Sequence, residues 1–364
     1  TEQVPVDERI FGEGHWLRPA MLEVIRCNGL RIEDLTFVDS PFWVIHPIEC
    51  DDVTVRGVTV HSYNLNNDGC DPESCSNVLI EDCTFFTGDD GIAIKSGRDQ
   101  DGWRMGRPTE NVVIRNCTFN SKANGVCIGS EISGGVRNVY IENVRISGAK
   151  NGIYFKSNLD RGGFIEDIRV LGVQADTIRN SLIYFDPDYK SESREHYPTR
   201  FTDFRISDVT AGNVGNCAID ITGFQDMPIE NVRITDVTVG KAGIPVKVSY
   251  ADNVILQDIT INGGKYDMTA PSASKSLNGE WEVALSDTLP SRFISTVPVP
   301  GVITQARPSL GEDLDATGLT DDVGYDHVWY RCRFSLDMPE YPQAILKLRA
   351  KYNAEVWLNG VRIG

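Results

Sequence analysis

The chain has 364 residues, of which 41% are hydrophobic and 24% are charged, and its formal net charge is −17 at pH 7. This composition predicts a globular protein with a sizeable core and roughly two domains. The acidic balance argues against nucleic acid or an anionic membrane as partner, although a few local cations can still hold an acidic substrate. No apolar run approaches the ~20 residues of a membrane span.

The first residue is Thr1 rather than Met, and Gly364 falls inside an expected strand–turn unit. We therefore interpret the chain as a fragment, so the missing signal peptide says little about location. Residues 1–18 are polar and without a clear period, and we expect them to belong to a coil whose earlier part is missing.

A repeated alternation of apolar and polar residues follows, rich in β-branched side chains, which is typical of strands. Its copies begin at Leu30, Val53, Val78, Val112, Val139, Ile168, Phe204, Val232 and Val254. These starts are about 22 to 36 residues apart, which is the range of solenoid repeats. Asn, Asp or Gly precedes or splits many copies, as turns require. Because one coil cannot bury its inner face alone, the pattern predicts an all-β, right-handed parallel β-helix.

A second motif lies about twelve residues after most of these starts. Its copies are Asp68-Gly-Cys-Asp-Pro-Glu-Ser, Asp90-Gly-Ile-Ala-Ile-Lys-Ser, Asn124-Gly-Val-Cys-Ile-Gly-Ser and Asn151-Gly-Ile-Tyr-Phe-Lys-Ser. Equivalent positions of adjacent coils lie ~4.8 Å apart. The motif therefore predicts two columns: Asp68, Asp90, Asn124 and Asn151 in one, and Glu73, Lys95, Gly129 and Lys156 in the other. An earlier copy that ends at His46 would place this histidine in the second column.

Two longer connections, 98–109 and 186–200, are expected to wall a groove beside the coils. Near Lys265 the pattern changes, and we predict a β-helix over 1–266, a linker over 267–276 and a second domain over 277–364. The second domain is expected to be a partial, truncated β-sandwich of the jelly-roll, galactose-binding kind. Its expected strands include the segments at 277–283, 328–336 and 344–348.

Nine cysteines occur, and several stand at matching repeat positions. Cys27, Cys50 and Cys75 match one another, and so do Cys83 and Cys117. We predict that they are small buried residues stacked in the core, with disulfides as the alternative. No Cys-x-x-Cys pair or His/Cys cluster indicates zinc, and we expect neither a metal nor another cofactor.

Three carboxylates, Asp68, Asp89 and Asp90, converge if the columns stack as predicted. Consecutive residues of a strand point to opposite faces, so Asp89 and Asp90 share a site only if the chain bends there, as the flanking glycines permit. Like charges at this separation raise the pKa of at least one carboxyl. A protonated acid beside ionised ones is what glycosidic hydrolysis needs. The alternative is that these residues only cap turns, which we expect for Asp71.

Cationic and aromatic residues near the columns are candidates to bind substrate. Lys95 and Lys156 can hold a sugar carboxylate, and His46 and Arg137 are further candidates. The alternatives are solvated lysines, a solvated turn arginine and a histidine of the core or rim. Tyr154 can stack on a sugar ring, although aromatic residues of such repeats more often belong to the core.

These motifs resemble glycoside hydrolase family 28, the polygalacturonase family of pectinases, over about 12–266. The family's Asn-Thr-Asp-Gly appears as Asn66-Asn67-Asp68-Gly69 and its Gly-Asp-Asp as Gly88-Asp89-Asp90, and the run at 128–139 looks like bacterial exo-acting members. The resemblance implies a right-handed parallel β-helix that hydrolyses α-linked galacturonic acid with inversion and without a metal. It also implies that Asp89 is the general acid, while Asp68 and Asp90 position and deprotonate the water.

Two departures from the family pattern bear on the substrate. The family's Gly-His-Gly reads Ala123-Asn124-Gly125, which makes Asn124 a candidate substrate-binding residue in place of the histidine. The family's Arg-Ile-Lys reads Tyr154-Phe155-Lys156, so the lysine is kept and the arginine, which helps to bind a uronate, is absent. His46 and Arg137 can compensate for that loss.

The C-terminal stretch resembles the N-terminal sugar-binding domain of glycoside hydrolase family 2 enzymes, which carries no catalytic acids. Leu277-Asn-Gly-Glu-Trp, Trp329-Tyr-Arg and Glu355-Val-Trp-Leu-Asn-Gly carry this resemblance. It implies an accessory module or the beginning of a second catalytic unit.

The favoured hypothesis is an inverting, polygalacturonase-like pectin hydrolase that is secreted or periplasmic and acts on a pectic polysaccharide or oligosaccharide. The sequence does not predict its oligomeric state. A pectic glycosidase of other specificity is the first alternative, as an exo-galacturonosidase or a rhamnogalacturonan hydrolase. A non-catalytic polysaccharide-binding β-helix is the second. A pectate lyase is the third, but it would need a calcium-binding carboxylate cluster and an arginine base.

Overall fold

The computed structural model describes residues 18–190, 197–269, 277–301, 303–310, 327–335 and 354–362. The chain divides into two compact units, Thr1–Ser272 and Ala273–Gly364. The coil expected before residue 18, residues 270–276 of the linker expected over 267–276 and the strand expected at 344–348 lie outside the described residues. The described part of that linker includes a strand, Met268–Thr269.

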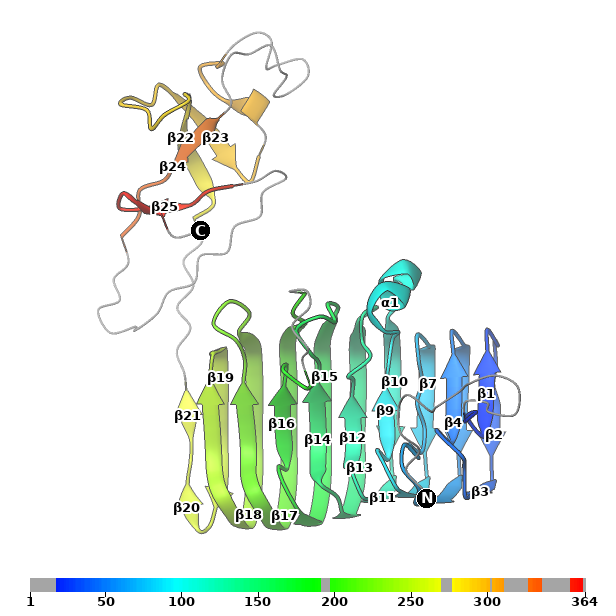
Figure 1. Cartoon of the computed structure of the whole chain (residues 1–364). Helices are drawn as coiled ribbons and strands as arrows, with labels where there is room; N and C mark the ends of the chain where they lie inside the picture. Colours follow the sequence, from blue (N-terminus) through cyan, green and yellow to red (C-terminus); the bar gives the residue numbers. More distant parts are fainter. Residues whose placement is uncertain are drawn as a thin grey trace, which may run out of the picture. The chain divides into compact units, whose positions relative to one another are not determined.

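The first unit is a parallel β-helix, as the alternation predicted, with strands stacked in three rows that form three faces (Figure 1). The first face consists of β2 (Arg31–Glu33), β5 (Asp51–Arg56), β7 (Ser76–Glu81), β10 (Thr109–Arg115) and the starts of β13 (Val136–Gly148), β15 (Phe164–Ile178), β17 (Arg200–Thr222), β18 (Ile229–Ser249) and β19 (Ala251–Ile261). The second consists of β3 (Thr36–Val38), β6 (Thr59–Ser62), β8 (Thr84–Thr87), β11 (Thr118–Ser121) and later parts of the long strands.

The third face carries the second sequence motif. It consists of β1 (Leu22–Ile25), β4 (Ile45–Ile48), β9 (Ile92–Ile94), β12 (Asn124–Ile128), β14 (Asn151–Lys156), β16 (Ile183–Asp186) and the ends of β17 and β18. Cys70 and Glu73 bridge β4 to the next coil. The last coil is covered by β20 (Gly264–Lys265) and β21 (Met268–Thr269), which pair antiparallel with β19.

Stacked Asn and Asp residues make the turns between faces. Asp82, Asn116 and Asn143 occupy one turn position in successive coils, with φ of 55°, 54° and 50°. Asn143 donates its side-chain amide to Asn116 at 2.8 Å, and Asn116 donates to Asp82 at 3.1 Å. Asn and Asp tolerate this left-handed conformation better than other residues with a side chain. The turn role that the sequence assigned to these residues is therefore confirmed.

The core is a continuous interior of Val, Ile, Phe and Cys side chains from all three faces. All nine cysteines are free thiols, and seven of them are buried. The backbone amide of Cys27 points at the sulfur of Cys50, and that of Cys50 at the sulfur of Cys75, each at 3.4 Å. The predicted burial is confirmed for Cys50, Cys75, Cys83 and Cys117, whereas Cys27 is only half-buried.

The connection after β9 contains a short helix, α1 (Asp99–Met105), which the sequence had indicated only as an insertion. In the described part of the chain, no helix is long and apolar enough to cross a membrane.

The second unit has antiparallel strands, as its sequence predicted. Its three-stranded sheet has β22 (Gly279–Leu285) between β23 (Ser295–Val299) and β24 (Val328–Arg331), and β25 (Trp357–Leu358) pairs with β26 (Val361–Arg362). A short 3-10 turn, η2 (Ile303–Gln305), adds to a small core around Val283, Val297 and Ala306.

Replacement of Phe119 by Ala is expected to lower the free energy of unfolding by about 3–5 kcal/mol, the usual cost of a large core cavity. Phe119 is fully buried and stacks on Phe85 with ring centroids 5.4 Å apart. Chemical denaturation measures the change. Phe86→Ala is the matched control, because Phe86 is only half-buried and its ring stacks on His61 outside the core. Equal losses in the two variants would contradict the assigned core.

Candidate active site

The acid cluster, defined as Asp68, Asp89 and Asp90, lies where the second face gives way to the third. β8 ends at Thr87 and β9 begins at Ile92, so the two consecutive aspartates occupy a bend rather than a strand. The Thr87 hydroxyl donates to the Asp89 carbonyl at 2.9 Å, and the Ser121 hydroxyl donates to the same oxygen. These contacts hold the bend that the flanking glycines had suggested.

Glycine follows Asp68 and Asp90 because the neighbouring coil leaves no room for a side chain. A Cβ on Gly69 would lie 2.4 Å from the Phe85 ring and 2.5 Å from the Gly91 carbonyl oxygen. A Cβ on Gly91 would lie 2.5 Å from the Phe119 ring. The repeated Asp-Gly therefore meets two requirements at one place: a buried carboxyl outside the hydrophobic core and a backbone packed against the aromatic residues of that core.

The two predicted columns are present in the structure. Asn124 lies opposite Asn151, and the Gly91 amide bonds the Asn124 carbonyl at 2.8 Å, as the Gly69 amide does the Asp90 carbonyl at 2.9 Å. In the second column, Glu73 lies opposite Lys95 and Lys156 lies opposite Asp186.

The expectation that His46 belongs to the lysine column is wrong by two residues. Ile48 lies opposite Glu73 and Ile45 opposite Cys70, so His46 is level with Asp71. Side chains alternate with a period of two, so a slip of two residues preserves the apolar pattern and the sequence cannot reveal it. The His46 ring is buried, with Nδ1 3.3 Å from Glu23 and Nε2 3.0 Å from Glu73.

The two lysines are buried partners of the acid cluster rather than solvated cations. Lys156 places its Nζ 2.8 Å from Asp90 Oδ2. Lys95 places its Nζ 3.2 Å from Glu131 and 3.7 Å from Asp68, and 4.4 Å from the centre of the Trp43 ring. Both side chains are less than 10% exposed. Each lysine therefore supplies a fixed positive charge inside the site.

Burial and the two lysines shift the pKa values of the three acids in different directions. Burial raises the pKa of Asp68 to about 8, with Lys95 opposing the shift. Burial also raises the pKa of Asp89, and the charge of Asp90 adds to this effect. For Asp90, burial acts in the same direction, but Lys156 outweighs it and holds the pKa below the ordinary value. Near neutral pH the site therefore contains an ionised Asp90 beside carboxyls that retain protons more strongly.

Asn124 helps to hold Asp90 instead of facing open space. It donates its amide to Asp90 Oδ1 at 2.5 Å and accepts from Asn151 at 2.7 Å. Asn180 donates to Asn151 at 2.8 Å, and Asn216 donates to Asn180 at 3.0 Å. A ladder of side-chain amides thus runs along the fold and ends on the Asp90 carboxylate, so each amide orients the next.

Two acidic residues of the site were not identified from the sequence. Asp71, expected to be a turn residue, is fully buried, and neither carboxyl oxygen has a hydrogen-bond partner among the described residues. Burial raises its pKa well above the ordinary value, and Asp68 adds to the shift. Glu131 pairs with Lys95 and lies three residues after the end of β12. The sequence could have indicated Glu131 through its place in the Gly-Ser-Glu run. Its ion pair with Lys95 could not be predicted, because Lys95 lies in a neighbouring coil.

Two other predicted substrate-binding residues, Arg137 and Tyr154, are bonded to acidic residues of the protein. Arg137 lies at the start of β13 on the first face, opposite Glu110, and pairs with that glutamate at 2.7 Å. Tyr154 is buried, stacks on Tyr184 with ring centroids 4.9 Å apart and donates its hydroxyl to Asp186 at 2.6 Å. Among the described residues, no group of three or more His, Cys, Asp or Glu side chains is placed to hold a metal ion.

The fold and the acid cluster define a parallel β-helix protein with a carboxylate-rich site on one face. The model of the Glycosyl hydrolases family 28 matches residues 13–259. The chain belongs to this family.

Individual relatives are consistent with the family. A probable polygalacturonase of Vitis vinifera is 33% identical over 66% of this chain and 50% of its own length. An endo-polygalacturonase of Pectobacterium parmentieri is 24% identical over 60% of this chain and 53% of its own. The crystal structure of a hyperthermoactive exopolygalacturonase from Thermotoga maritima superposes with a TM-score of 0.67 and 33% identity, covering 73% of this chain and 60% of that one. The chain spans about half the length of these two curated relatives.

Replacement of Asp68 by Asn is expected to stabilise the protein increasingly as the pH rises. An unfolded Asp ionises near ~3.9, whereas Asp68 in the folded protein keeps its proton up to about 8. The parent therefore loses stability as the pH rises through this window, and the loss is complete above it. The variant lacks that loss, so the difference in free energy of unfolding should grow from near zero at about pH 3 to a maximum at about pH 9.

Urea denaturation across this pH range measures the difference. Asp101→Asn is the matched control, because the Asp101 side chain is 87% exposed. A constant difference across the range would contradict the assigned protonation of Asp68.

Proposed function

We propose that the chain is a pectin hydrolase that cleaves a glycosidic bond of α-linked galacturonic acid with inversion at the acid cluster. The observation that carries the proposal is the division of protonation between Asp89 and Asp90. Asp89 is half-buried and keeps its proton more strongly than an ordinary aspartate, whereas Asp90 is held ionised by Lys156. An acid and a base in one site are what single-displacement glycosidic hydrolysis requires.

The roles of the three acids follow from their surroundings. Asp89 is the more exposed of the two consecutive aspartates and donates its proton to the leaving glycosidic oxygen. Asp90 accepts a proton from the attacking water and is kept in place by Lys156 and the Asn124 amide. Asp68, which keeps its proton up to about pH 8, positions that water from the adjacent coil and leaves the deprotonation to Asp90. The water attacks the anomeric carbon as the bond to the leaving oxygen breaks, so the configuration of that carbon inverts.

The lysine pair is proposed to attract the sugar carboxylate without providing the whole site for it. Lys95 and Lys156 are already paired with carboxylates of the protein, so a uronate would share their charge with Asp68 or Asp90. Where the family pattern has arginine, Tyr154 bonds Asp186 and carries no positive charge. This replacement favours a pectic glycosidase of altered specificity as the second candidate function, for example an exo-galacturonosidase or a rhamnogalacturonan hydrolase.

We also propose that the protein acts outside the cytoplasm, where a pectic polymer is accessible. The second unit is proposed to be an accessory sugar-binding module like that of glycoside hydrolase family 2 enzymes. Its antiparallel sheet of β22, β23 and β24 and the Glu282–Arg331 ion pair at 2.7 Å support a folded module.

Replacement of Asp89 by Asn is expected to lower kcat by at least 10²–10⁴-fold, the usual contribution of a general acid, while oligosaccharide binding is retained. Reducing-sugar release measures activity, and calorimetry measures binding. Asp101→Asn is a matched exposed control that should leave both unchanged. Full activity in Asp89→Asn would remove this residue from the mechanism.

The parent protein is expected to hydrolyse a pectic substrate and to release the inverted anomer first. Homogalacturonan and rhamnogalacturonan should be digested in parallel, with products separated by chromatography and the fresh anomer assigned by proton NMR. Binding without hydrolysis of either polymer would favour a polysaccharide-binding β-helix. Products that absorb as unsaturated uronides would identify a lyase instead.

A further inference from the structure

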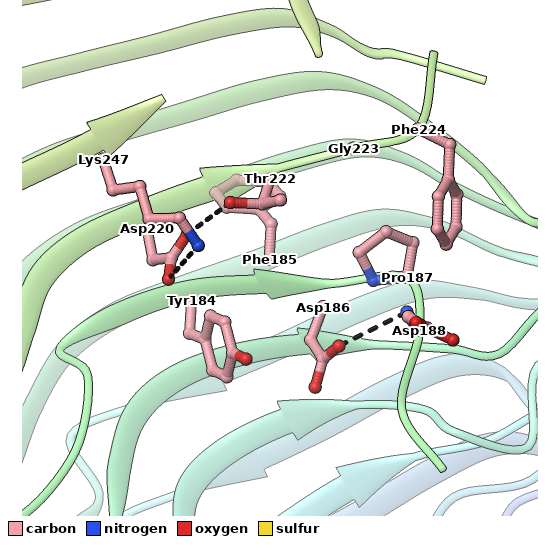
Figure 2. A pocket seen from close by; sticks show the side chains of 10 residues that line it. All are labelled: Tyr184, Phe185, Asp186, Pro187, Asp188, Asp220, Thr222, Gly223, Phe224 and Lys247. Carbon is pink, nitrogen blue, oxygen red and sulfur yellow. Dashed lines mark hydrogen bonds and ion pairs between the residues drawn. The ribbon is translucent and has the colours of Figure 1, made fainter. Parts of the chain in front are cut away.

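A cavity opens on the third face beyond the acid cluster, in the coils that follow Lys156. It has a volume of about 160 Å³, and its walls include Tyr184, Asp186, Asp220, Thr222, Phe224 and Lys247 (Figure 2). A cavity of ~150 Å³ is enough to admit a benzene ring. The volume is therefore of the size that a single six-membered ring needs.

The register places the cavity in line with the catalytic residues. Tyr184 lies opposite Tyr154, Asp220 lies opposite Tyr184, and Lys247 lies opposite Asp220. These positions continue the face of the fold that carries Asp90. The Tyr184 and Asp220 coils are the third and fourth after that of Asp90, roughly 14–19 Å away at ~4.8 Å per coil. A chain of sugars bound at Asp90 and extended along this face reaches the cavity several residues from the cleaved bond.

The charge of the cavity is opposite to what a galacturonate carboxylate needs. Asp186, Asp188 and Asp220 line it, and among the described lining residues Lys247 is the one cation. Lys247 is already paired with Asp220, with its Nζ 3.5 Å from the carboxylate. A uronate here would meet two further aspartates, and like charges at such a separation repel.

The walls suit a neutral sugar instead. Figure 2 shows Tyr184 and Phe224 on opposite sides of Asp186 and Pro187. Both rings are half-buried and offer apolar surface to the C–H face of a sugar. Asp220 accepts from the Thr222 hydroxyl at 2.7 Å, and Asp186 accepts from Tyr154 at 2.6 Å. Ionised carboxylates have up to four acceptor positions, so both aspartates can also accept from sugar hydroxyl groups.

We propose that this cavity is a subsite for an uncharged sugar ring, so that the protein prefers a pectic chain in which neutral sugars accompany galacturonic acid. The inference rests on the proposed function, because the acid cluster defines where the chain of sugars begins. It assigns a specificity role to side chains that no step of the hydrolysis uses. The substrate class is a mixed oligosaccharide rather than a pure polygalacturonate.

The test compares the binding of two hexasaccharides to the Asp89→Asn protein by isothermal titration calorimetry. One contains galacturonic acid alone, and the other alternates galacturonic acid with rhamnose. The mixed hexasaccharide is expected to bind about tenfold more tightly, and Asp220→Asn or Phe224→Ala should each abolish that preference. A disaccharide, too short to reach the cavity, should bind equally to all variants. Asp176→Asn is the matched control, on β15 and paired with Arg145 in an exposed ion pair.

A variant that gains affinity for the galacturonate hexasaccharide distinguishes a role of the cavity in binding from a role in folding. Asp188 is exposed, so Asp188→Lys should fold as the parent does and should shift the preference toward the galacturonate hexasaccharide. Equal affinity of the parent for the two hexasaccharides, or a preference that survives Asp220→Asn and Phe224→Ala in folded protein, would overturn the subsite. A preference for the mixed chain in a parent that hydrolyses neither polymer would leave the subsite standing and contradict the proposed hydrolase.

Discussion

The coil-to-coil register of the parallel strands is the constraint on which the site depends. Each coil places its third-face strand directly beside the next, so one outward position becomes a line of side chains. At the Asp68 and Asp90 positions this line holds two carboxyls, and at Asn124 and Asn151 it continues as amides that bond each other. The packing of Gly69 and Gly91 against Phe85 and Phe119 ties this polar line to the core.

The buried lysines convert that alignment into chemistry. Three buried or half-buried aspartates that repel one another would otherwise all be driven toward the neutral form. Lys156 acts most strongly on Asp90 and lowers its pKa, whereas Lys95 divides its charge between Asp68 and Glu131. Two consecutive aspartates in a regular repeat therefore differ in pKa, which is raised for Asp89 and lowered for Asp90. That asymmetry follows from the side chain of Lys156, which pairs with Asp90 and lowers its pKa.

The electrostatic character changes along the same face. Around the acid cluster the fixed cations are buried and paired, so the site can attract an acidic sugar through local charge despite the net charge of −17. Further along, Asp186, Asp188 and Asp220 outnumber Lys247. A face with buried, paired cations at one place and an excess of aspartates further along is suited to a chain whose sugars also differ in charge. The departures from the family pattern at Asn124 and Tyr154 lie between these two regions.

The sequence by itself determined the all-β solenoid, the two columns and the convergence of the acid cluster. A repeat with period-two alternation specifies which residues face outward and which coils are equivalent, so Asp68, Asp90 and Asn124 could be aligned without a structure. Tertiary structure alone decided the register of His46, the pairing of Lys156 with Asp90, the burial of Asp71 and the place of Arg137 on another face. A slip of two residues leaves the alternation unchanged, and the partner of a long buried side chain depends on coils that are distant in sequence. The charges that set a pKa likewise become neighbours only when those coils stack.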